Sequence, residues 1–110
     1  MSEEKKPEEI DIIVIDLEIF LREGREVPKG PHYHYIITVD RQKFKVKQEC
    51  MTGREILQLA GKIPAERFQL NQRYKGGKVV KIGYNQVVCF TEPGIEKFMT
   101  IPLDQTEGGN

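Results

Sequence analysis

Residues 32–47 hold two adjoining runs in which apolar and polar residues alternate, separated by the polar link Asp40-Arg41-Gln42. A period of two places every second side chain on the same face of a β-strand, and a short polar link between two such runs is typical of a hairpin. We therefore predict a β-hairpin, and with it a sheet. The side chains expected to face the core are Tyr33, Tyr35, Ile37, Val39, Phe44 and Val46, and those expected to face outward are His32, His34, Ile36, Thr38, Lys43, Lys45 and Lys47.

A short helix is predicted to begin just after this hairpin. Thr52-Gly53-Arg54-Glu55 is a capping box, in which the Thr52 side chain accepts a hydrogen bond from the Glu55 backbone and the Glu55 side chain accepts one from the Thr52 backbone. Gly61, with Pro64 just beyond it, is a typical helix end. The helix should therefore have only about two to three turns.

The order of the later elements favours an α+β fold. Further extended segments are predicted at 68–70, 79–82 and 86–90, with a Gly76-Gly77 turn among them. Two strands, a crossover helix and returning strands within about 60 residues suit a β-grasp, a mixed sheet of four or five strands curled over one short helix. In that layout the final strand, placed here at 86–90, pairs parallel to the first strand at the centre of the sheet.

The residues before the hairpin are expected to form a leader segment. Residues 1–9 carry charges and no apolar side chain after the first residue, which predicts disorder. Periodicity over the next residues fits both a helix and a strand, but a β-branched cluster favours a strand at 11–15, followed by a helical turn or two at 16–23. Glycines and prolines dominate 24–31, which predicts a connector. We divide the chain into a disordered tip and leader (1–31), a β-grasp domain (32–103) and a flexible C-terminal tail (104–110).

Composition argues against several classes of protein. The 110 residues include 17 Lys and Arg against 17 Asp and Glu, which disfavours nucleic-acid binding. No apolar stretch approaches the roughly 20 residues that span a bilayer, and the first residues do not resemble a secretory signal. We therefore expect a cytoplasmic protein. In such a reducing compartment Cys50 and Cys89 are expected to be buried thiols and not a disulfide.

Several segments resemble the bacterial multiubiquitin domain family, a group of ubiquitin-like modifiers. The likeness runs from about Tyr33 to the end, and its specific parts are the sequences TGREILQLAG (52–61), EPGIEKF (92–98) and PLDQTEG (102–108). Many members of the family carry tandem copies, whereas this sequence has the length of one. Members are encoded beside an activating-enzyme homologue, a conjugating-enzyme homologue and a JAB-type metallopeptidase. The resemblance therefore implies these three partners and a ubiquitin-like conjugation pathway.

The same resemblance gives a role to Gly108 and Gly109, which are followed by Asn110. It implies that a peptidase cuts after Gly109 and removes Asn110, and that the Gly109 carboxylate is then adenylated and transferred. Two glycines leave the reacting carbonyl unhindered and let the backbone run extended into a narrow channel. ATP would be used by the activating enzyme, so this chain is expected to need no cofactor.

Other candidate sites are weaker. The sequence has no motif of a catalytic site, and we expect no enzyme activity. His32, His34 and Cys89 lack the spacing of a metal site, and none is predicted. His34, Ile36, Lys45 and Lys47 are candidates for a partner surface, with a plain solvated face as the equal alternative. Two other functions stay open, namely a non-covalent β-grasp adaptor and, less favoured, a sulfur carrier.

Overall fold

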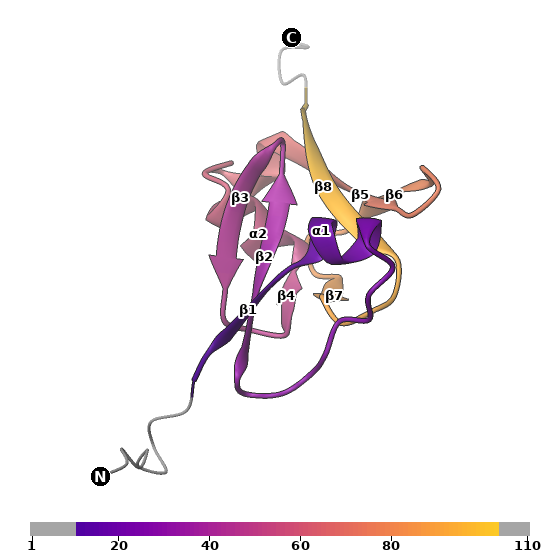
Figure 1. The fold of residues 1–110 in the computed structure, drawn as a ribbon. Helices are drawn as coiled ribbons and strands as arrows, with labels where there is room; N and C mark the ends of the chain where they lie inside the picture. The colour runs from indigo at the N-terminus through magenta and orange to yellow at the C-terminus, as the bar shows by residue number, and fades with distance from the viewer. Residues whose placement is uncertain (1–10, 104–110) are drawn as a thin grey trace, which may run out of the picture.

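A computed structural model describes residues 11–103, and within them it shows a six-stranded mixed sheet, a two-stranded ribbon and two short α-helices (Figure 1). The sheet has the order β1-β2-β8-β5-β6, with β3 also paired to β2, and the ribbon joins β4 and β7. The elements are β1 (Ile13–Asp16), α1 (Leu17–Arg22), β2 (Tyr33–Val39), β3 (Gln42–Val46), β4 (Cys50–Thr52), α2 (Gly53–Leu59), the 3-10 turn η1 (Ala65–Arg67), β5 (Phe68–Tyr74), β6 (Val79–Ile82), β7 (Val87–Cys89) and β8 (Ile95–Pro102).

The predicted hairpin is confirmed as β2 and β3, which pair antiparallel. Its turn places Asp40 and Arg41 at φ of 50° and 72°, the left-handed conformation that two-residue hairpin turns require. Alternation correctly predicts the core positions Tyr35 and Ile37, which are both buried. The prediction that Thr38 faces solvent is wrong, because helix α1 covers this part of the outer face and leaves Thr38 only 4% exposed.

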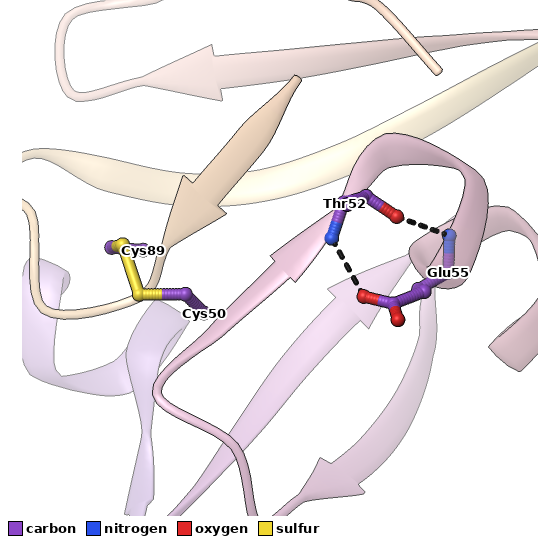
Figure 2. Close-up of a disulfide and its surroundings, with 4 residues drawn as sticks. All are labelled: Cys50, Thr52, Glu55 and Cys89. Carbon is purple, nitrogen blue, oxygen red and sulfur yellow. Dashed lines mark hydrogen bonds between the residues drawn. A yellow bond between two sulfur atoms is a disulfide. The ribbon is translucent and has the colours of Figure 1, made fainter. Parts of the chain in front are cut away.

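The predicted helix is confirmed as α2. Both hydrogen bonds of its capping box are present, with Glu55 N donating to Thr52 Oγ1 at 3.1 Å and Thr52 N donating to Glu55 Oε1 at 2.9 Å (Figure 2). Ile56 and Leu57 are fully buried in one core with the inward residues of β2. The described chain is therefore a mixed α+β fold in which one short helix packs across a sheet, as a ubiquitin-like β-grasp requires.

The final strand of the sheet was predicted in the wrong place. β7 leaves the sheet and pairs with β4, whereas β8 lies between β2 and β5 and meets β2 in parallel at Val39 and Phe98. The sequence hides β8 because a bulge at Glu96 puts one extra residue between two buried side chains, Ile95 and Phe98. A bulge breaks the alternation by which a strand is recognised.

The leader joins the sheet instead of lying beside it. β1 pairs in parallel with β2, and α1 packs against β2 and β8, in front of them in Figure 1. Ile15 and Leu17 belong to the hydrophobic core. The sheet therefore has six strands where four or five were expected, and the expected boundary near residue 31 is crossed by backbone pairing.

The expectation of two free thiols is wrong, because Cys50 and Cys89 form a disulfide (Figure 2). The two residues lie directly opposite each other in the β4–β7 ribbon, with their Cα atoms 4.0 Å apart. Nothing in the sequence near either cysteine indicates this pairing, which arises only when β7 leaves the main sheet. The bridge stands two residues before the Thr52 cap of α2.

Candidate functional site

The predicted conjugation and cleavage residues, Gly108, Gly109 and Asn110, lie outside the described residues. The structure does show where the chain leaves the fold on its way to them. Pro102, the last residue of β8, pairs with Phe68 of β5, and the Leu103 N–H donates to the Arg67 carbonyl at 2.8 Å. The base of the C-terminal segment is therefore hydrogen-bonded into the sheet up to Leu103.

A carboxylate from the β2–β3 turn holds this end of β8. Asp40 Oδ1 accepts a hydrogen bond from the Thr100 backbone N–H at 2.8 Å, and Asp40 Oδ2 accepts one from the Thr100 hydroxyl. The Lys62 ammonium lies 3.8 Å from the same carboxylate. Asp40, in a turn distant in sequence from β8, thus holds the last residues of β8 in place before the chain leaves the sheet, and Lys62 lies beside the Asp40 carboxylate.

Two apolar side chains are exposed at this exit. Ile101 and Leu103 are 47% and 38% exposed. Single exposed apolar residues are ordinary, but two at alternate positions of the exit offer a partner apolar contact beside the segment it would receive.

Three of the four residues of the predicted partner surface share the outer face of the sheet. The register places Ile36 of β2 opposite Lys45 of β3, and alternation places His34 on the same face, whereas Lys47 follows the last residue of β3. His34 and Ile36 are half-buried, whereas Lys45 and Lys47 are exposed and have no carboxylate partner among residues 11–103. His34 Nδ1 is buried without a hydrogen-bond partner in the described part of the chain. We name these four residues the outer-face patch.

The alternative metal set of His32, His34 and Cys89 does not form, because the Cys89 sulfur is bonded to Cys50. Residues 11–103 also hold no group of three or more side chains placed to bind a metal ion. No helix in this range is both long enough and apolar enough to cross a membrane.

Comparison with known proteins identifies the family of this domain. A family model described as multiubiquitin matches residues 35–102, from within β2 to the last residue of β8. The chain belongs to the multiubiquitin family. Neither the curated proteins nor the solved structures contain a match to it.

The match to the multiubiquitin family leaves β1 and α1 outside it, yet an ion cluster binds them to the domain. Lys43 of β3 donates to Asp16 Oδ2 at 3.0 Å and to Glu18 Oε1 at 3.1 Å, and the Thr38 hydroxyl donates to the same Glu18 oxygen at 3.0 Å. Lys43 was predicted to lie on an open face. The cluster leaves no local sequence signal, because its members come from four separate elements.

The cluster changes the acidity of two of its members. Burial by itself would raise the pKa of Glu18, but hydrogen bonds from Lys43 and Thr38, with the charges of Lys43 and Arg22, bring the pKa below its usual value. Burial would likewise lower the pKa of Lys43, and the two carboxylates raise it instead. Both groups are therefore held in their charged forms across the neutral range, and they attach the leader to the sheet by charge-assisted hydrogen bonds.

Proposed function

We propose that this member of the multiubiquitin family is a ubiquitin-like protein modifier, made as a precursor and cleaved after Gly109 before conjugation. The observation that carries the proposal is the family match over 35–102 followed by the Gly108-Gly109 sequence. Other proteins would bind the chain through its folded domain, and the C-terminal segment would be the substrate on which they act.

The geometry at the end of β8 supports these separate roles for the folded domain and the C-terminal segment. Leu103, the last residue that the structure describes, donates its N–H to the Arg67 carbonyl of η1, and residues 104–109 separate it from the reacting carboxylate. Six residues reach at most about 20 Å when fully extended. An activating enzyme that takes up Gly109 must therefore also lie close to the exit, where Ile101 and Leu103 are exposed.

The chemistry belongs to the partners. A JAB-type metallopeptidase would hydrolyse the bond after Gly109. The activating-enzyme homologue would join the Gly109 carboxylate to the AMP part of ATP with release of pyrophosphate, and a cysteine thiolate would then displace AMP to form a thioester. The conjugating-enzyme homologue would pass the acyl group to the target. Glycine suits these steps because it adds no side chain near the carbonyl under attack.

Mass spectrometry of the chain incubated with the peptidase, the activating enzyme and ATP tests the proposal. We expect loss of the residue after Gly109, followed by a thioester-linked adduct with the activating enzyme. Deleting Asn110 should bypass the peptidase. A chain lacking Asn110 that forms no adduct with an active enzyme would refute the modifier function, and a thiocarboxylate in place of a conjugate would indicate a sulfur carrier.

The glycines themselves provide matched variants. Replacing Gly109 by leucine, or deleting Gly108 and Gly109, should abolish the adduct while changing the melting temperature little, since the tail was expected to pack against nothing. A large loss of stability on deletion would show that this expectation is wrong.

The outer-face patch supports a second function, that of a non-covalent adaptor. Lys45 lies opposite the half-buried Ile36, and neither Lys45 nor Lys47 has a carboxylate partner among residues 11–103, so the patch would suit a partner with acidic residues beside an apolar one. Titration with the purified conjugating-enzyme homologue, followed by NMR shifts of Ile36, tests it. Binding that Lys45→Glu abolishes, in a chain whose Gly109→Leu variant still binds, would favour the adaptor.

A further inference from the structure

The outer edge of β1 is unprotected. Within the described residues β1 pairs only with β2, and Ile12, Ile13 and Val14 are 46%, 49% and 43% exposed. Sheet edges in soluble proteins usually carry a lysine, a proline, a bulge or a covering segment that prevents strand addition. The sequence from Ile12 to Ile15 has neither a charge nor a proline.

The backbone of this edge is available for hydrogen bonds. The Ile13 N–H donates at 2.8 Å to the carbonyl of His32, the residue just before β2, so Ile13 directs its backbone groups inward to the sheet. Successive residues of a strand direct them to opposite sides. Ile12 and Val14 therefore present their N–H and C=O groups at the open edge.

A hollow adjoins this edge of the sheet. It has a volume of about 660 Å³ and is lined by the apolar Ile13, Phe20, Pro28 and Tyr33 and by the charged Arg25 and Glu26. Side chains of a strand next to β1 would enter this mixed apolar and charged hollow. Backbone pairing combined with a receiving hollow is the usual basis of recognition by strand addition.

We propose that the open edge of β1 binds the β1 strand of a second copy of this chain, antiparallel and about a two-fold axis. With Ile13 opposite Ile13 of the second copy, Ile12 of each copy lies opposite Val14 of the other. In each of the two Ile12–Val14 pairs, the two residues direct their backbone N–H and C=O groups toward each other. The two pairs together give roughly four hydrogen bonds between the copies. The proposal is independent of the modifier function.

The chemistry of the edge favours a second copy over a foreign strand. Its register is self-complementary in hydrogen bonds, and each exposed apolar side chain gains an apolar neighbour, as a two-fold interface requires. Asp16, at the C-terminal end of β1, is already paired with Lys43, so its charge does not oppose the contact. The other edge strands, β3 and β6, carry lysines, whose charges oppose the addition of a second copy.

The contact is small, and the dimer should therefore be weak and depend on concentration. Sedimentation velocity of the full chain from micromolar to millimolar concentration should show reversible dimerisation. Ile13→Lys should weaken the association by about tenfold or more, because it opposes two like charges at the centre of the interface. Val79→Lys, at a half-exposed valine of the far edge strand β6, is the matched control and should change nothing.

A cysteine cross-link tests the register. Opposed residues that are not hydrogen-bonded to each other lie about 4.5 Å apart between Cα atoms, within reach of a disulfide. Both native cysteines are bonded to each other and leave no free thiol to interfere. Ile13→Cys should give a covalent dimer under mild oxidation and Val79→Cys should not. A wild-type chain that stays monomeric at millimolar concentration, or equal cross-linking of the two variants, would overturn the proposal.

Discussion

Asp40 and Thr100 are 60 residues apart in sequence, and both oxygens of the Asp40 carboxylate accept hydrogen bonds from Thr100. The pair joins the β2–β3 turn to the last residues of β8, from which the C-terminal segment departs. Asp40 therefore acts together with the pairing of β8 to β5 to hold the strand that leads to the proposed reactive end.

Asp40→Ala should lower the free energy of unfolding by about 2–4 kcal/mol, because it removes both acceptors and places alanine at positive φ. Asp40→Asn should have a smaller effect, since asparagine keeps one acceptor and tolerates the left-handed conformation. Urea denaturation of the two variants measures the difference. Equal stabilities would show that the hydrogen bonds to Thr100 contribute little.

Thr52→Ala should reduce stability by about 1 kcal/mol through loss of the side-chain cap of α2. Glu55→Gln is the matched control, because glutamine can still accept the reciprocal hydrogen bond from the Thr52 backbone. Thermal unfolding followed by circular dichroism compares the variants. An unchanged Thr52→Ala midpoint would mean that the cap has no net effect on stability.

Cys50→Ser should destabilise the oxidised protein by about 4 kcal/mol, the chain-entropy value for a bridge across a separation of 39 residues. Adding dithiothreitol to the wild type should produce a similar loss, and the variant should not respond to it. Guanidinium denaturation with and without reductant makes the comparison. A wild type insensitive to reductant would contradict this stabilising role.

The lowered pKa of Glu18 predicts that the free energy of unfolding decreases as the pH falls. Because folding lowers its pKa below the unfolded value of 4.5, it stabilises the fold above that pH, and the contribution is lost as the pH falls through the lower folded value. Glu18→Gln should therefore lose less stability than the wild type between pH 7 and pH 3. Denaturation curves at both pH values test this, and parallel losses in the two proteins would refute it.

Local signals predicted the elements whose determinants lie close together in sequence. Alternation placed β2 and β3, and the Thr52-to-Glu55 capping box placed the start of α2. The bulge at Glu96 hid β8, because one inserted residue removes the alternation on which strand prediction rests. The outer-face patch was predicted from strand parity, and α1 then removed Thr38 from that face.

The sequence by itself determined the hairpin, the capped helix and the likeness to the multiubiquitin family, because each depends on neighbouring residues. Only the tertiary structure decided that the leader supplies an open strand to the sheet, that Lys43 holds it there, and that Cys50 meets Cys89. These features join segments from 20 to 39 residues apart, whose approach is set by how the whole core packs.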